Sequence, residues 1–310
     1  MVHKFGTAVL VILLSLGLIA VQESAAVTKQ PKKAAVHKRS ASVKKHRTPQ
    51  KVNYAPQQLV LRSASVMVED QRTGESLFQK RAEAILPIAS ITKLMTAMVV
   101  LDAQLNLQEP LTIEQEDVDM LRHSRSHLPV GSCITRKEAL LLALMSSENR
   151  AAHALGRTYP GGLDAFIPAM NAKAQSLGLT ETRFKDPTGL SSANVSSARN
   201  LARMVDTAYQ YPLIREFSTC EAAVVHTGSH TRGFRNTNSL VRSSRWQIGL
   251  SKTGFIDEAG RCLVMQAKVA KRPVVIVLLD AQGKMTRFAD ANRIRQWMEN
   301  PPPSRRTQRG

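Results

Sequence analysis

The order of the expected elements is the feature that most constrains how this chain folds. Strand patterns stand near both ends of one long stretch, residues 56–300, and helical patterns fill its middle. Asp70-Gln71-Arg72-Thr73-Gly74 separates the first two strand segments and is typical of a hairpin turn. Further strands and a closing helix follow after residue 221. We therefore predict an α/β (α+β) fold: one antiparallel sheet assembled from both ends of the stretch, with a helical layer inserted.

The individual elements are expected at defined ranges. Strands are predicted at Leu59–Val68, Ser76–Gln79, Ala222–His226, Trp246–Ser251, Leu263–Val269 and Pro273–Leu279. Helices are predicted from Ser90 onward, after the capping-box pattern Thr135-Arg136-Lys137-Glu138, and at Arg150–Arg157, Leu163–Leu177, Ser197–Tyr209 and Met285–Glu299. No internal repeat is visible.

The first 26 residues have the pattern of a secretory signal peptide. Lys4 supplies the positive charge, Ala8–Val21 is mostly apolar, and Ser24-Ala25-Ala26 offers the small residues that a signal peptidase requires. An uncleaved membrane anchor is the alternative, although the apolar run is shorter than the roughly 20 residues of a membrane span. We therefore expect residues 1–26 to direct export.

Positive charge is concentrated outside the long stretch. The total of +19 suggests a nucleic-acid binder at first sight. Residues 27–55 carry +9 without any acidic residue and residues 301–310 carry +3, which leaves +7 for residues 56–300. Because residues 27–55 show no apolar period, they are predicted to form a disordered basic tether. We expect it to attract anionic envelope polymers and no nucleic acid; a solvated spacer without a partner explains it equally well.

Composition excludes several broad classes of protein. Hydrophobic residues make up 43% and charged residues 22%, which excludes a wholly disordered chain, a coiled-coil rod and a polytopic membrane protein. Three cysteines, Cys133, Cys220 and Cys262, are too few for a disulfide-built fold. At most one disulfide can form among them, and buried free thiols are the simpler expectation.

Three short motifs carry groups suited to acyl transfer. In Ser90-Ile91-Thr92-Lys93 the hydroxyl and the amine share a helix face, so the lysine can act as base for the serine. Ser147-Glu148-Asn149 follows a predicted helix, where the serine can pass a proton and the amide can hold a substrate carbonyl. Lys252-Thr253-Gly254 ends a predicted strand and supplies a second amine, a hydroxyl for a carboxylate, and room for substrate along the strand edge.

Each motif alone is a weak signal, because the chain contains imitations of all three. These are Ser42-Val43-Lys44-Lys45, Ser192-Ala193-Asn194, Arg72-Thr73-Gly74 and His226-Thr227-Gly228. The specific signal is the order in which the motifs follow one another, at a helix start, a helix end and a strand end.

Taken together, the motifs resemble the signature of penicillin-binding proteins and serine β-lactamases. The chain is more closely similar to the small D-alanyl-D-alanine peptidases of the S11 type, through Pro87–Thr96, Asp186–Leu190 and Ser196–Arg199. Within that family it most resembles the endopeptidase branch, the penicillin-binding protein 7 type, through Met145–Ala152, Phe234–Asn238 and Leu250–Met265. The resemblance implies a penicillin-binding protein/serine β-lactamase-like transpeptidase fold, with residues 56–300 as a serine DD-peptidase catalytic domain.

The resemblance also implies a role for each matching residue. Ser90 would be the acylated nucleophile, Lys93 its base, and Ser147 the group that relays a proton to the leaving amine. The substrate would be bound by Asn149, Lys252, Thr253 and Gly254, and the oxyanion by the backbone N–H groups of Ser90 and Phe255. No metal and no cofactor are implied. Arg261 is a further candidate for a substrate carboxylate, with a surface charge as the alternative.

The implied activity is a serine D-alanyl-D-alanine endopeptidase in the periplasm that hydrolyses peptidoglycan crosslinks through a Ser90 acyl-enzyme. Stem peptides would be its substrates and β-lactam antibiotics its covalent inhibitors. Carboxypeptidases of the family carry an added C-terminal β-domain, for which the 56 residues after Gly254 leave no room.

Three alternatives stay open at this point. The first is a D-alanyl-D-alanine carboxypeptidase. The second is a serine β-lactamase, in which a carboxylate such as Glu148 would have to be aimed at the acyl bond through water. The third is a non-catalytic wall-binding module, and the intact motifs argue against it.

Overall fold

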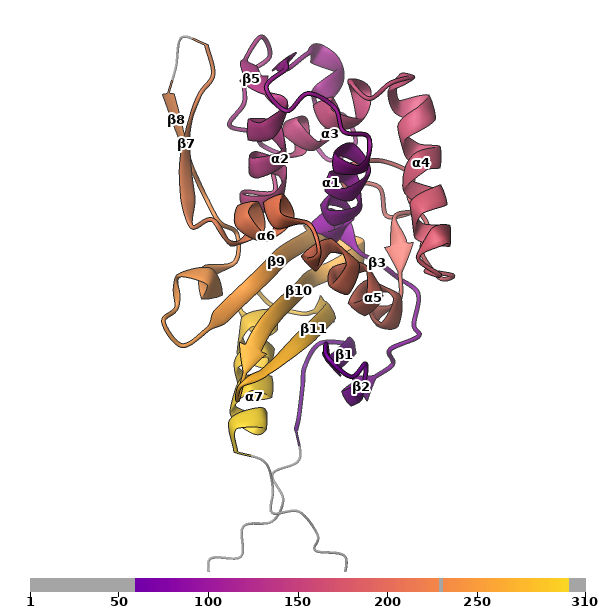
Figure 1. Ribbon diagram of the computed structural model, residues 1–310, viewed down its shortest axis with the longest axis vertical. Helices are drawn as coiled ribbons and strands as arrows, with labels where there is room; N and C mark the ends of the chain where they lie inside the picture. Colours follow the sequence, from indigo (N-terminus) through magenta and orange to yellow (C-terminus); the bar gives the residue numbers. More distant parts are fainter. Residues whose placement is uncertain (1–58, 229–230, 301–310) are drawn as a thin grey trace, which may run out of the picture. The chain divides into compact units, whose positions relative to one another are not determined.

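A five-stranded antiparallel sheet lies at the centre of the computed structural model, which describes residues 59–228 and 231–300. Its order is β2-β1-β11-β10-β9 (Figure 1). The strands are β1 (Ser65–Asp70), β2 (Ser76–Lys80), β9 (Gln247–Ile256), β10 (Gly260–Val269) and β11 (Arg272–Ala281). β1 pairs with β11, with Ser65 opposite Leu279, so strands from both ends of the described chain lie side by side. The predicted antiparallel sheet is confirmed.

Helices cover both faces of this sheet. On one face lies α7 (Thr286–Glu299), whose Phe288 packs with Val66 and Val68 of β1. The alternate β1 residue, Met67, belongs to the larger core beneath the other helices. Those helices are α1 (Lys93–Asp102), α2 (Arg136–Met145), α3 (Asn149–Arg157), α4 (Gly162–Ser176), α5 (Ala198–Tyr209) and α6 (Pro212–Thr219). The result is the predicted arrangement of a helical layer inserted between strands of one sheet (Figure 1).

Local sequence signals explain where the main helices begin. The Thr135 hydroxyl accepts a bond from the Glu138 N–H, while the Glu138 carboxylate accepts from the Thr135 N–H, so the predicted capping box forms at α2. At α5 the Ser197 hydroxyl accepts a bond from the Asn200 N–H and so caps the helix without a reciprocal bond. In contrast, α1 is buried on nearly every side, as expected of a core helix, and this burial includes its first residue, Lys93.

Several short elements escape the sequence patterns. They are the strand pairs β3 (Leu86–Pro87) with β6 (Val195–Ser196) and β4 (Pro110–Thr112) with β5 (Cys133–Thr135), and the strand β8 (Thr231–Arg235), which pairs with the correctly predicted β7 (Ala222–His226). Four 3₁₀ turns are η1 (Ala89–Thr92), η2 (Gln115–Asp117), η3 (Ser239–Arg242) and η4 (Asp257–Ala259). Together with α6 they are too short to show a reliable period.

Two predicted strand boundaries are wrong by five residues or more. The strand expected from Leu59 begins only at Ser65, because the Ser63 N–H donates to the Asp290 carboxylate of α7 (2.7 Å) and not to a neighbouring strand. The strand expected to end at Ser251 continues to Ile256. Lys252, Thr253 and Gly254 therefore lie inside β9 and are buried there, although their polarity suggested a strand end.

The expected signal peptide (1–26), tether (27–55) and tail (301–310) lie outside the described residues. Within the described ranges, no helix has the length and apolar character needed to cross a membrane.

Candidate active site

Ser90 lies in η1, one turn before the buried start of α1. Its neighbour Ala89 has a φ of +47°, a left-handed conformation that residues other than glycine rarely adopt. Such strained residues persist only where the surroundings hold them, and they cluster at functional sites. Ser90 itself remains half-buried, with its hydroxyl open to a cleft.

Lys93 lies beneath Ser90 and is fully buried. Its Nζ donates to Ser90 Oγ (2.8 Å), to Asn149 Oδ1 (2.8 Å) and to the Thr188 carbonyl (2.6 Å). Burial lowers the Lys93 pKa to about 7, although the carboxylates of Asp186, Glu148 and Asp119 pull it upward. Near neutral pH a large share of this amine is uncharged and can accept a proton from the neighbouring hydroxyl.

The second motif lies in the connection between α2 and α3. Ser147 adopts a φ of +62°, again left-handed, and Asn149 is the first residue of α3. The Asn149 amide nitrogen donates to Ser124 Oγ (2.8 Å), while its oxygen accepts from Lys93. Both ends of the amide are therefore held by side chains from other parts of the chain.

The third motif approaches the first two from β9, the edge strand of the sheet. Lys252 is buried, and its Nζ donates to Ser147 Oγ (2.8 Å) and to the Thr253 carbonyl (3.0 Å). Burial, followed by the positive charges of Lys93 and Arg287, lowers the Lys252 pKa well below its usual range. The site thus contains two serine–lysine pairs with the same 2.8 Å spacing.

Gly254 allows β9 to pass directly against the Ser90 turn. A Cβ at this position would lie 2.9 Å from the Ile88 carbonyl oxygen and 3.1 Å from the Ser90 nitrogen. Only glycine fits without a shift of the strand or the turn. This contact brings the residue after Gly254, Phe255, to the same cleft as Ser90.

These residues surround a cleft of about 410 Å³. Its lining comprises Ser90, Arg122, Ser124, Ser147, Asn149, Leu190, Thr237, Thr253, Gly254, Phe255, Ile256, Asp257 and Arg287. Of the eight residues to which the resemblance assigns a role, the two lysines are absent from the lining, because they lie beneath the serines that they contact. The structure therefore brings these eight residues together.

Four participants were not identified from the sequence. The Thr188 carbonyl contacts Lys93, Ser124 contacts Asn149, and Thr237 accepts from the Thr253 hydroxyl (2.6 Å). The fourth is Arg287 of α7, whose Nη1 donates to the Gly254 carbonyl (2.9 Å) and whose pKa burial lowers to about 10. The candidate Arg261 instead lies over the Phe255 ring, 4.2 Å from its centroid.

The Thr188 carbonyl is placed by a tight loop that follows α4. The Asp186 carboxylate accepts from the backbone N–H groups of Thr188 (2.6 Å) and Gly189 (2.7 Å). Gly189 has a φ of +83°, and a Cβ there would lie 2.0 Å from the Ala89 carbonyl oxygen. The loop is therefore fastened against the turn that holds Ser90. This explains physically why the chain has an Asp-Pro-Thr-Gly sequence here.

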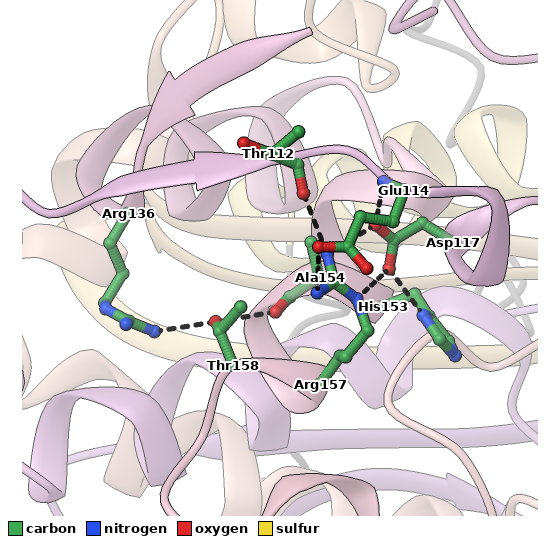
Figure 2. A network of polar contacts seen from close by, with 8 residues as sticks. All are labelled: Thr112, Glu114, Asp117, Arg136, His153, Ala154, Arg157 and Thr158. Atoms are coloured by element: carbon green, nitrogen blue, oxygen red, sulfur yellow. Dashed lines mark hydrogen bonds and ion pairs between the residues drawn. The ribbon is translucent and has the colours of Figure 1, made fainter. Parts of the chain in front are cut away.

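A buried polar network holds the segment that supplies Ser124 (Figure 2). Asp117, at the end of η2, contacts His153 Nδ1 (2.7 Å) and Arg157 Nη2 (2.8 Å) of α3. Burial opposes ionisation of Asp117, but these two partners outweigh it, so its pKa is lowered. Since α3 begins at Asn149, the network ties the start of the segment 118–128 to the helix that carries the site amide.

Glu148 does not line the cleft. It is buried, and its Oε2 accepts from the backbone N–H of His127 (3.3 Å). Its absence from the cleft lining gives no support to a β-lactamase, which would need this carboxylate aimed at the acyl bond.

All three cysteines are free. Cys262 is buried, as expected, and burial raises the pKa of its thiol to about 11. Cys220 is half-buried, and the expectation of a buried thiol is wrong for Cys133, which is exposed in the short strand β5.

The family model described as D-alanyl-D-alanine carboxypeptidase, Peptidase_S11, matches residues 51–283. The chain belongs to the S11 peptidase family. It is 52% identical over 246 residues to a D-alanyl-D-alanine endopeptidase of Pseudomonas aeruginosa, covering 79% of each chain. It is 50% identical over 239 residues to a D-alanyl-D-alanine endopeptidase of Escherichia coli, covering 76% of this chain and 77% of the relative.

The fold of this S11 peptidase is shared with a solved structure. The crystal structure of the Streptomyces K15 DD-transpeptidase matches it with a TM-score of 0.72 at 30% identity, covering 77% of this chain and 97% of that one. The penicillin-binding, transpeptidase-like fold predicted from the motifs is therefore confirmed.

Proposed function

We propose that this protein is a serine D-alanyl-D-alanine endopeptidase that hydrolyses peptide crosslinks in peptidoglycan. The observation that carries the proposal is the fully buried Lys93, with its pKa lowered to about 7, at 2.8 Å from Ser90 Oγ. The two relatives at 50–52% identity are both named D-alanyl-D-alanine endopeptidases, which supports this activity over carboxypeptidase or β-lactamase activity.

Acylation begins when neutral Lys93 accepts the Ser90 proton. The Oγ then attacks the carbonyl carbon of the D-alanyl peptide bond, and negative charge develops on the carbonyl oxygen. The backbone N–H groups of Ser90 and Phe255, two residues that line the cleft, would stabilise that charge. The peptide C–N bond breaks as Ser147 donates a proton to the leaving amine. Lys252, bonded to the Ser147 hydroxyl, is placed to replace that proton.

Deacylation uses the same groups in reverse order. A water molecule attacks the ester carbonyl and loses a proton to Ser147, which passes a proton on to Lys252. Ser90 leaves with the proton that Lys93 accepted during acylation. A β-lactam follows the first half of this sequence, because its strained amide acylates Ser90. Its leaving nitrogen remains tethered to the acyl group, so the ester is hydrolysed slowly. β-Lactams are therefore expected to be covalent inhibitors.

Substrate binding is assigned to the free edge of β9 and the opposite wall of the cleft. An edge strand can hydrogen-bond an extended peptide through its backbone. Asn149 would hold a substrate carbonyl through its amide. Lys252, Thr253 and the nearby Arg287 would provide positive charge and a hydroxyl for a carboxylate on the leaving-group side.

Labelling by a fluorescent penicillin, combined with digestion of purified muropeptides, tests this function. We expect a stable label on the wild type and on Ser176→Ala, a matched surface serine whose hydroxyl contacts only its own helix, and no label on Ser90→Ala. Crosslinked dimers should be converted to monomers. Label on Ser90→Ala would contradict the mechanism, rapid penicillin turnover would indicate a β-lactamase, and release of D-alanine from monomeric pentapeptides with dimers left intact would indicate a carboxypeptidase.

We further propose that the protein acts in the periplasm, where these crosslinks are found. Residues 1–26 would be removed on export, and residues 27–55 would attract anionic envelope polymers. N-terminal sequencing of the mature protein should begin near Val27, and retention of Met1 would contradict cleavage. Deletion of residues 27–55 should weaken sedimentation with anionic vesicles and leave penicillin labelling intact, whereas unchanged sedimentation would leave these residues as a spacer.

A further inference from the structure

An ion pair joins the two rims of the cleft. Arg122, from the segment 118–128 on the helical side, places Nη2 at 2.8 and 2.9 Å from the two carboxylate oxygens of Glu258. Glu258 lies in η4, directly after β9 on the sheet side. Arg122 and the neighbour of Glu258, Asp257, both line the cleft that contains Ser90. The pair therefore connects walls that belong to different layers of the fold.

The pair is anchored on the arginine side. Arg122 Nε donates to the Leu190 carbonyl (2.6 Å), and the Arg122 backbone N–H donates to the Asp119 carboxylate (3.0 Å). On the other side, the Arg122 guanidinium lowers the pKa of Glu258, so this carboxylate is charged at neutral pH. The Arg122 side chain is 22% exposed and that of Glu258 48% exposed. The link is thus reachable from solvent but held in a defined position.

The order of residues along β9 shows which end of the cleft the pair closes. Lys252 contacts Ser147, which serves the leaving amine in the proposed mechanism, and Gly254 lies against the Ser90 turn. Glu258 comes four residues after Gly254, in the opposite direction from Lys252. The acyl part of the substrate must extend in this direction. β9 continues for only two residues beyond Gly254, about 7 Å at about 3.3 Å per residue, before the turn that holds Glu258. An extended chain leaving Ser90 therefore meets the pair after a few residues.

We propose that Arg122 and Glu258 are specificity-determining residues that limit how far the acyl side of a substrate can extend along β9. This inference rests on the proposed function, because it takes the direction of the acyl chain from the role of Ser147. A short acyl group fits between Ser90 and the pair. A longer or bulkier one has to separate Arg122 from Glu258, and its acylation rate is reduced accordingly.

β-Lactams offer a direct test, because their acylamino side chain stays on the acyl part after ring opening. We would measure second-order acylation rate constants for 6-aminopenicillanic acid, which has no acyl side chain, and for a penicillin with a long amide-linked fluorophore. The quantity of interest is the ratio of the long-chain to the short-chain rate constant. We expect Glu258→Gln to raise this ratio about two- to fivefold, the factor that a surface ion pair typically contributes.

A matched control separates the bridge from surface charge in general. Arg199 and Glu83 form an exposed ion pair of similar length (2.6 Å) outside the cleft, so Glu83→Gln should leave the ratio unchanged. High salt should raise the wild-type ratio toward that of Glu258→Gln and leave the ratio of the variant constant, because screening weakens only the intact pair.

Arg122→Gln provides a second variant. Because it breaks the same bridge, the double variant Arg122→Gln/Glu258→Gln should not exceed the larger single effect. A ratio that is unchanged in Glu258→Gln, or that changes equally in Glu83→Gln, would overturn the inference. Failure of both β-lactams to label wild-type Ser90 would instead overturn the proposed function, so the two failures are distinguishable.

Discussion

In both serine–lysine pairs of the cleft the lysine Nζ lies 2.8 Å from the serine Oγ, but the two pairs are brought together in different ways. Ser90 and Lys93 lie within one turn of chain, whereas Ser147 and Lys252 are separated by 105 residues and come from different layers. Both lysines are buried and both have lowered pKa values. Lys93 is surrounded by carboxylates that favour its charged form, while the charges next to Lys252, on Lys93 and Arg287, oppose it. The neighbouring charges therefore make Lys252 release a proton more readily than Lys93.

The first pair depends mainly on local chain geometry, whereas the second depends on tertiary structure. The first pair needs only a strained turn at Ala89 and a helix to bury Lys93. The second exists only after β9 has been placed against the α2–α3 connection, and Gly254 allows that approach. Substitutions in the first pair should thus directly affect removal of the Ser90 proton. The contact between Ser147 and Lys252 should in addition be sensitive to any shift of β9.

The largest effect is expected from breaking the first pair. Lys93→Met removes the base and fills its space with an apolar chain of similar length, so acylation by a fluorescent penicillin should fall by about 10³-fold. Stopped-flow fluorescence measures the rate, and thermal melting checks the fold. Lys268→Ala, an exposed lysine on β10, is the control and should react at the wild-type rate. Retention of more than a tenth of the activity in Lys93→Met would exclude Lys93 as the base.

A smaller effect is expected from breaking the second pair. Ser147→Ala removes the proton donor for the leaving amine, and hydrolysis of crosslinked muropeptide dimers should fall by about 10²-fold. Chromatography of the digested dimers gives the rate. Ser146→Ala is a closely matched control, because the Ser146 hydroxyl donates to the Leu142 carbonyl of its own helix. Equal losses in both variants would point to damage of the connection and not to proton transfer.

The smallest effect is expected from changing the distance between the pairs. Gly254→Ala forces β9 away from the Ser90 turn, and acylation should fall roughly tenfold because the groups on the two sides no longer align. Gly233→Ala serves as the control, since a Cβ at Gly233 meets no atom within 4 Å. If Gly254→Ala acylates like the wild type, the close approach of β9 is not needed for the reaction.

Much of this architecture could be predicted from the sequence, and the failures have physical causes. The capping box at Thr135 and the spacing of Ser90 and Lys93 each involve residues close together in the sequence. Both could therefore be predicted without knowledge of the fold. The end of β9 was predicted too early because Lys252 and Thr253 are polar, and polar residues usually lie outside a buried strand. Functional sites often depart from such sequence patterns. The Thr188 carbonyl could not be found, since a backbone atom has no side-chain signature. Arg287 has no distinguishing signal, since it is one of several arginines in the closing helix.

The most direct measurement is the pH dependence of Ser90 acylation by a β-lactam. The neutral form of Lys93 is the base, and its pKa is lowered to about 7. The rate constant should therefore be small at acidic pH, rise about tenfold per pH unit below 7, and level off above it. A rate that keeps rising toward pH 10, as for an ordinary lysine, or that is independent of pH between 5 and 9, would contradict the assignment of buried Lys93 as the base.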